Sequence, residues 1–139
     1  MKLFFRSSIS LLLILSLSYH IKSQNIDSTK NKFKVEPFVF VEKMPSFPGG
    51  DSAMITFIKN NLAYPNSARI NKIEGTVVVQ FVVDKYGNLI SPYVVRGISP
   101  DCDKEALRIL SVMPKWIPGH HNGKDVKVAF TLPIRFKLH

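Results

Sequence analysis

Two adjacent histidines, His120 and His121, are the residues of this chain best suited to bind a metal ion. They lie in the glycine-rich segment 118–124 (PGHHNGK), where two imidazoles could supply two ligands. A closed site needs more ligands than these, and the segment offers no third one. His20 and His139 lie near the two ends of the chain. The sequence therefore predicts a solvated loop here, and no metal site.

Cys102 is the single cysteine, so no disulfide can form within one chain. It lies between Asp101 and Asp103, whose negative charges disfavour the thiolate that a nucleophile needs. We interpret it as a small, half-buried helix residue. The chain also has no phosphate-binding glycine loop, no HExxH motif and no plausible Ser-His-Asp set. These patterns predict that the protein is not an enzyme and holds no cofactor.

Composition favours one globular domain that binds something other than nucleic acid. The chain has 139 residues, 45% of them apolar, which is enough for a single hydrophobic core. Its formal net charge is +9, but the basic residues are scattered along the sequence and form no dense block. A nucleic-acid-binding protein is expected to cluster such charges along one face.

The N-terminus has the pattern of an export signal at residues 1–23. Lys2 and Arg6 are followed by the apolar run Ile9–Leu17 and then by small residues up to Ser23. We expect cleavage after Ser23, with cleavage after Ser18 as the alternative. The apolar run is about half of the roughly 20 residues that a membrane-spanning helix needs. An uncleaved anchor in the inner membrane is the other interpretation.

The following residues predict a tether and then the first helices. Residues 24–43 comprise a polar tether and an extended strand at 35–41, which Pro37 restricts to a sheet edge or a strand start. Turn residues at 44–50 precede a helix from an N-cap at Asp51, with Met54, Ile55, Ile58 and Leu62 on its apolar face. Tyr64-Pro65 ends this helix, and a second short helix is expected from Pro65 to about Ile73.

A hairpin and a third helix come next. The β-branched segment 76–83 and the segment 89–96 flank a turn at 84–88, with a bulge or a locally unpaired position expected at Pro92. Val77, Val79, Phe81 and Val83 share one face of the first strand. A helix capped by Ser99 or Asp101 is expected to reach Val112, followed by a loop at 116–123 in which Trp116 contributes to the core.

The last strand, predicted at 126–136, has the clearest alternation in the chain. Apolar residues occupy every second position from Val126 to Phe136, which indicates a half-buried antiparallel strand. Pro133 cannot donate a backbone hydrogen bond, so the strand is expected at a sheet edge. Such an edge either accepts a strand from another chain or is blunted by Pro133 and its charged neighbours Lys127 and Arg135. The residues alone leave both interpretations open.

Taken in order, these segments resemble the C-terminal domain of TonB, the periplasmic energy transducer of Gram-negative envelopes. The resemblance covers residues 44–138 and rests on the following pieces: 44–50 (MPSFPGG), Tyr64-Pro65, 73–75 (IEG) leading into 77–83 (VVVQFVV), Gly87, 103–108 (DKEALR), 113–119 (MPKWIPG) and the final strand with Pro133. It implies an α+β fold, with a three-stranded antiparallel sheet and two main helices on one face. The residues add an N-terminal strand and an extra helix to that plan.

The resemblance also implies a site and partners. In the family, the last strand accepts the TonB box, a short N-terminal peptide of an outer-membrane receptor, and the segment around Tyr64-Pro65 lies near it. The matching positions here are Val126, Lys127, Val128, Ala129, Phe130, Thr131, Leu132, Ile134, Tyr64 and Pro65. Expected partners are TonB-dependent outer-membrane receptors and inner-membrane motor proteins. A homodimer is a further expectation, because an open edge favours self-pairing.

The N-terminal region departs from a full transducer, which has a transmembrane anchor and a long proline-rich spacer. A polar tether of about 11 residues reaches only about 40 Å when fully extended. Two functions therefore remain as hypotheses for a domain at 44–139. One is receptor docking in energy-coupled transport, and the other is a soluble periplasmic interaction or scaffolding module without energy transduction.

Overall fold

The computed structural model describes residues 41–139, which form three helices and five strands. The predicted leader, the tether and most of the predicted strand at 35–41 lie outside these residues. The elements are α1 (Gly50–Asn61), α2 (Asn66–Ile70), β1 (Gly75–Val83), β2 (Leu89–Arg96), α3 (Pro100–Val112), β3 (Gly119–His121), β4 (Lys124–Val126) and β5 (Val128–Phe136).

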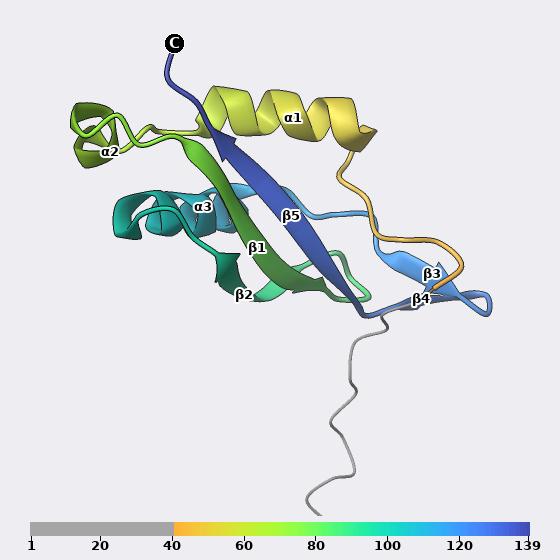
Figure 1. The fold of residues 1–139 in the computed structure, drawn as a ribbon. Helices are drawn as coiled ribbons and strands as arrows, with labels where there is room; N and C mark the ends of the chain where they lie inside the picture. Colours follow the sequence, from red (N-terminus) through yellow and green to blue (C-terminus); the bar gives the residue numbers. More distant parts are fainter. Residues whose placement is uncertain (1–40) are drawn as a thin grey trace, which may run out of the picture. The chain divides into compact units, whose positions relative to one another are not determined.

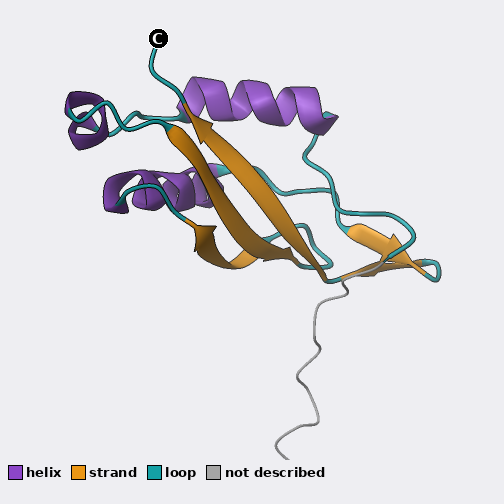
Figure 2. Ribbon diagram, viewed as in Figure 1, coloured by secondary structure: helices purple, strands orange, loops and turns teal. Residues whose placement is uncertain are grey.

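One three-stranded antiparallel sheet, in the order β2-β1-β5, organises the described part of the chain (Figure 1). The strands β3 and β4 form a separate small hairpin. Helices α1 and α3 pack on one face of the large sheet, while α2 is a single short turn beside the start of β1 (Figure 2). The predicted α+β class, with three strands and two main helices on one face, is confirmed.

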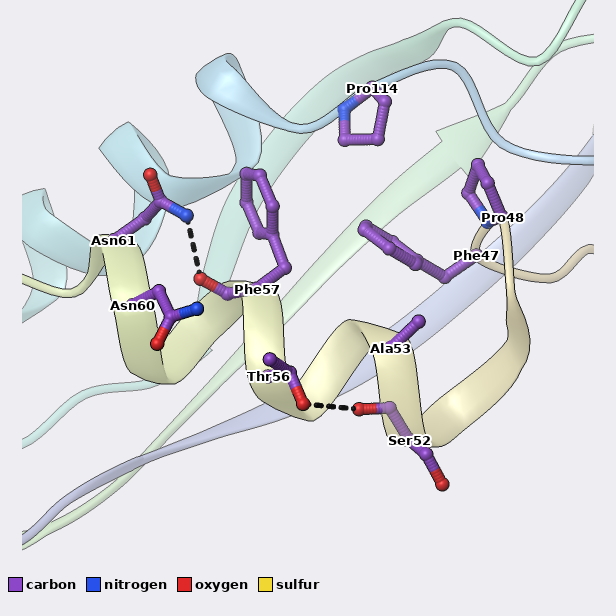
Figure 3. Close-up of a pocket in the computed structure, with 9 residues that line it drawn as sticks. All are labelled: Phe47, Pro48, Ser52, Ala53, Thr56, Phe57, Asn60, Asn61 and Pro114. Carbon is purple, nitrogen blue, oxygen red and sulfur yellow. Dashed lines mark hydrogen bonds between the residues drawn. The ribbon is translucent and has the colours of Figure 1, made fainter.

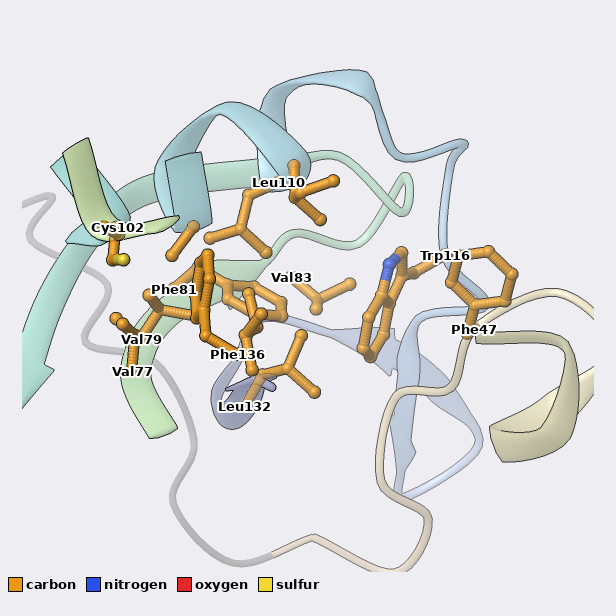
Figure 4. Close-up of a cluster of buried hydrophobic side chains, with 14 residues drawn as sticks. Phe47, Val77, Val79, Phe81, Val83, Cys102, Leu110, Trp116, Leu132 and Phe136 are labelled. Carbon is orange, nitrogen blue, oxygen red and sulfur yellow. The ribbon is translucent and has the colours of Figure 1, made fainter. Parts of the chain in front are cut away.

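The core lies between that sheet face and the two helices (Figure 4). The four predicted inward residues of β1, from Val77 to Val83, are fully buried. They meet the apolar side of α3 and the matching face of β5 in one cluster: Cys102, Ala106, Ile109, Leu110, Leu132, Ile134 and Phe136. Cys102 is completely buried, deeper than the sequence suggested. Burial of this apolar surface is the main term that holds the sheet and helices together.

The strands β1 and β5 pair in an unbroken register of nine residue pairs, from Gly75↔Phe136 to Val83↔Val128. Among residues 41–139, the other side of β5 has no partner strand, so within the described part of the chain the edge position that Pro133 predicted is confirmed. The opposite edge, β2, is less regular. Its register against β1 shifts between Gln80 and Val82, opposite Ser91 and Pro92, where Ser91 has a positive φ of 52°. The bulge expected at Pro92 is therefore present.

Several expected boundaries differ from the structure. Gly49, not Asp51, is the N-cap of α1, and Asp51 lies within its first turn. Ile55 is 64% exposed, because the inward face of α1 is formed by its neighbours Ala53, Met54, Phe57 and Ile58. The short helix α2 begins after Pro65 and ends at Ile70, three residues earlier than expected.

The predicted loop at 116–123 contains β3 and the turn of the small hairpin. Asn122 and Gly123, both with positive φ, supply the two-residue turn between β3 and β4. Residues 43–46 pair with residues 117–120 through backbone hydrogen bonds such as that from Lys43 N–H to the His120 carbonyl (3.0 Å). The predicted last strand is consequently divided, because Val126 belongs to β4 and β5 starts only at Val128.

The β1–β2 turn is fixed at both ends. The Asp84 carboxylate accepts the backbone N–H groups of Tyr86 and Asn88, each at 2.8 Å. Burial opposes ionisation of Asp84, but these bonds outweigh it and lower its pKa. At the tip of the turn, the Gly87 carbonyl accepts a 2.9 Å hydrogen bond from the backbone N–H of Trp116. The Trp116 ring packs edge-on against Phe81, with 5.3 Å between ring centroids. The turn is thus attached to the core through Trp116.

We expect Gly87→Ala to destabilise the fold far more than Gly123→Ala. Both glycines have positive φ (85° and 73°), so alanine costs about 1 kcal/mol or more at each. A Cβ at position 87 would lie 2.0 Å from the Trp116 carbonyl oxygen, whereas one at 123 meets nothing within 4 Å. The loss at 87 should exceed that at 123 by at least about 2 kcal/mol in urea unfolding. Equal losses would show that the turn does not depend on this close approach.

Candidate functional site: the open edge of β5 and its groove

On the open edge of β5, the backbone N–H and C=O groups of every second residue point away from β1. Successive residues of a strand point their N–H and C=O groups to opposite sides. Pro133 lies opposite Val78 inside the unbroken β1–β5 register, which indicates that its nitrogen faces away from β1. Ala129, Thr131 and Arg135 share this orientation, so we infer that their N–H groups face the open side.

A groove of about 1020 Å³ lies beside the C-terminal half of this edge. One wall is α1, with Ile55, Ile58 and Lys59, and the chain after it adds Leu62 and Tyr64. The other wall is β5 itself, from Pro133 to Arg135. The remaining lining residues come from α2, its flanking turn and the end of the chain: Arg69, Lys72, Glu74, Lys137, Leu138 and His139. Apolar side chains and charged ones contribute to this lining in equal measure.

Tyr64 is held firmly in this groove. Its hydroxyl donates to the Ile73 carbonyl, and its ring packs edge-on against Phe136, with 5.8 Å between ring centroids. The Arg69 guanidinium lies over the same ring at 5.8 Å. Burial, with smaller contributions from Cys102 and Glu74, raises the pKa of Tyr64, so the phenol stays protonated and keeps donating.

The predicted site residues divide into distinct groups. Tyr64 and Ile134 line the groove, and Pro65 follows as the N-cap of α2. Ala129 and Thr131 lie on the open edge, further from the groove. Val128 and Leu132 are buried in the protein. Phe130 packs against Trp116, with 4.9 Å between the ring centroids. Val126 and Lys127 precede β5. The backbone of the predicted strand is therefore better placed for contact than many of its side chains.

A comparison with protein families bears on this arrangement. The sequence profile described as Gram-negative bacterial TonB protein C-terminal matches residues 60–138, more than half of the chain. The chain belongs to the TonB C-terminal family. Members of this family are protein-interaction domains of the cell envelope and not enzymes.

Solved structures and curated proteins were also compared. The chain is similar to two solution NMR structures of the Helicobacter pylori TonB C-terminal domain. The first has 25% identity and a TM-score of 0.49, covering 66% of this chain and 87% of the other. The second has 24% identity and a TM-score of 0.47, covering 62% and 90%. The comparison with curated proteins gave no match.

A buried carboxylate fixes the position of the groove wall in this TonB family domain. Glu105 of α3, with a side chain only 10% exposed, accepts the Ala63 N–H at 2.7 Å and two bonds from Arg108 at 2.7 and 2.8 Å. Arg108 in turn donates to the Asn61 carbonyl at 2.7 Å, at the end of α1. Because α1 has no fully buried residue, these bonds are a main attachment of its C-terminal end, next to Tyr64.

The same bonds stabilise the ionised form of Glu105. Burial alone would raise its pKa, but the hydrogen bonds from Arg108 and Ala63 outweigh this, and the pKa lies below its ordinary value. Arg108 correspondingly has a raised pKa, mainly through its bonds to Glu105. Sequence reasoning named both residues only as parts of the family pattern. Their spacing of three places them on one helix face, which was the available signal.

Sequence reasoning also missed the charge of the groove. The basic residues are scattered in the sequence, but the fold gathers Lys59, Arg69, Lys72, Arg135 and Lys137 around the groove, with Glu74 as the opposing acid. These cations come from α1, the region of α2 and the end of the chain. No local sequence pattern links such distant positions.

A second hollow, of about 560 Å³, lies on the other side of α1 (Figure 3). Phe47, Phe57 and Pro114 form its apolar part, and no charged residue lines it. Two of its polar side chains are bonded to their own helix: Thr56 to the Ser52 carbonyl at 3.0 Å and Asn61 to the Phe57 carbonyl at 2.8 Å. It adjoins no open strand edge, so it is a weaker candidate than the groove beside β5.

The two adjacent histidines lie in β3 and are half-buried, so the predicted solvated loop is wrong. His120 Nδ1 lies 3.1 Å from Asp125, and His121 Nδ1 lies 3.8 Å from Glu42. Among the described residues, no three His, Cys, Asp or Glu side chains form a metal-binding group. Within residues 41–139, no helix has the length and apolarity needed to cross a membrane.

We expect Glu105→Gln to lower stability in a pH-dependent way. Because the folded pKa of Glu105 is depressed, its contribution is present above the unfolded-state carboxyl pKa and is lost as pH falls through the folded value. Near neutral pH the variant should lose about 1–2 kcal/mol, since one charged acceptor is replaced by a neutral amide.

The measurement is urea unfolding at a series of pH values downward from neutral, and the difference in stability between the variant and the native protein should shrink as the pH falls through the folded pKa of Glu105. Asp51→Asn, which removes an exposed carboxylate from the first turn of α1, is the control and should show no such convergence. A difference between the Glu105 variant and the native protein that stays constant with pH would contradict the assignment.

Proposed function

We propose that this protein docks to the TonB box of outer-membrane receptors by accepting the receptor peptide as an additional strand on β5. The observation that carries the proposal is the open edge of β5, regular over nine residues and adjoining a groove that contains Tyr64. Backbone N–H and C=O groups along such an edge supply affinity, and the adjoining groove supplies side-chain selectivity.

Of the two sheet edges, β5 is the better acceptor. The β2 edge bends where its register shifts near Pro92, and an irregular edge cannot pair continuously with an added strand. On β5, only Pro133 lacks a donor among the residues facing outward. The strands of the complex would be loaded in shear when the receptor is pulled, so their hydrogen bonds would break together.

The proposed organisation follows from this role. Residues 1–23 act as the export signal, residues 24–43 as tether and N-terminal strand, and residues 44–139 as the docking domain in the periplasm. Packing of Phe47 against Trp116, at 6.0 Å between ring centroids, supports a domain start before residue 60. Force from inner-membrane motor proteins would reach the domain through an uncleaved leader or through a bound partner. With the leader removed, the protein acts as a soluble interaction module without direct energy transduction.

We expect Thr131→Pro to abolish peptide binding, whereas Thr131→Val leaves it unchanged. Thr131 is exposed and lies opposite Gln80, so proline would remove one outward N–H without breaking the β1 ladder. Proline also constrains the neighbouring backbone, so the loss should reach at least about tenfold. Isothermal titration with N-terminal peptides of TonB-dependent receptors gives the affinities. Unchanged affinity in a folded Thr131→Pro protein would rule out strand addition on β5.

We expect the mature protein to begin at Gln24. Cleavage after Ser23 removes the apolar run, so the protein should be recovered from the periplasmic fraction and not from the membrane. Mass spectrometry of the intact protein from both fractions measures this. Retention of residues 1–23 in the membrane fraction would instead establish an anchored protein and would favour direct energy transduction.

A further inference from the structure

The groove beside β5 combines apolar side chains with an excess of positive charge. Five cationic side chains line it, against the single acid Glu74, and the excess remains if the chain ends in a carboxylate at His139. Glu74 is already engaged, since it accepts the Leu138 N–H at 2.6 Å. Among the described residues, Lys59, Lys72, Arg135 and Lys137 have no ion-pair partner. Unpaired cations around one groove raise the local concentration of anions.

An apolar side chain of the groove is also unusually exposed to solvent. Ile55 is 64% exposed although it stands on a helix that packs against the sheet, and it lines the groove together with Ile58 and Leu62. A strand added to β5 would direct alternate side chains toward these residues and the others toward the face that carries Thr131 and Arg135. Apolar residues suit the first set of positions, and carboxylates suit positions near Arg135, Lys72 and Lys59.

We propose that this groove selects strand-forming peptides that carry several carboxylates beside their apolar residues. This inference rests on the proposed docking function and adds the chemical class of the peptide. A second copy of the chain fits poorly, because it would bring the same excess of cationic groove residues, among them Arg135 and Lys137, to this edge. Like charges brought together across an interface disfavour the pairing.

The test uses two synthetic ten-residue peptides that alternate Val and Thr at the centre. One carries two Glu residues at each end, and its twin carries Gln at the same four positions. The Glu peptide should bind the native protein about tenfold more tightly at about 0.01 M salt, since several exposed charge pairs act together. The advantage should largely vanish at about 1 M salt, where the Debye length falls to about 3 Å. Equal affinities at low salt would overturn the charge preference.

Matched variants locate the effect. Lys72→Gln combined with Arg135→Gln should remove most of the advantage of the Glu peptide. Lys104→Gln combined with Lys124→Gln changes the net charge equally but outside the groove, and it should leave the advantage intact. An equal loss with both pairs would show an effect of net charge alone and would contradict a selective groove.

The Thr131→Pro variant separates failure of this inference from failure of the docking function. If the Glu and Gln peptides bind the native protein equally and Thr131→Pro abolishes the binding of both, strand addition holds and the charge preference is wrong. If Thr131→Pro leaves the Glu peptide bound, the groove holds anions without strand addition, which contradicts both proposals. Sedimentation of the native protein alone checks the occupant: a dimer that Thr131→Pro converts to a monomer would identify a second copy and overturn the peptide assignment.

Discussion

The unbroken pairing of β1 with β5 is the constraint on which the rest of the structure depends. Its nine residue pairs place Val77, Val79, Phe81 and Val83 beside the inward residues of β5, so both strands present one continuous apolar face to the helices. A slip of one residue would turn every inward side chain of β5 to the opposite face. The same register fixes which backbone groups of β5 bond to β1 and which face the open side. The packing of the core and the set of backbone groups on the open edge are therefore fixed by one alignment.

The groove depends on a second, smaller interaction. Helix α1 contributes only half-buried residues to the core, yet it forms one wall of the groove. Its C-terminal end is fastened to α3 through Glu105 and Arg108, and these bonds also fix the chain just before Tyr64. Tyr64 in turn bonds to the Ile73 carbonyl at the approach to β1. The polar contacts thus align the groove wall with the open edge, while apolar burial supplies most of the stability.

Much of this fold was predictable because its signals are local. Alternation identified the faces of β1 and β5, Pro133 identified the edge, and Ser99 capped α3 as expected, accepting the Cys102 N–H at 3.2 Å. The sequence did not show that Ile55 is exposed, since an apolar residue at helical spacing fits the inward face equally well. It also did not show the cationic groove, because Lys59, Lys72 and Arg135 become neighbours only through the packing of α1 and α2 beside β5. The small hairpin was missed because its two strands have only three residues each.

The central claim is that the outward N–H groups of β5 accept a partner strand. Amide hydrogen exchange, followed residue by residue by NMR, tests it most directly. In the free protein, the amides of Ala129, Thr131 and Arg135 should exchange quickly, while those of Leu132 and Ile134 are protected by β1. A saturating receptor peptide should protect the first group and leave the second group as it was. The account is contradicted if Ala129, Thr131 and Arg135 still exchange quickly in the complex.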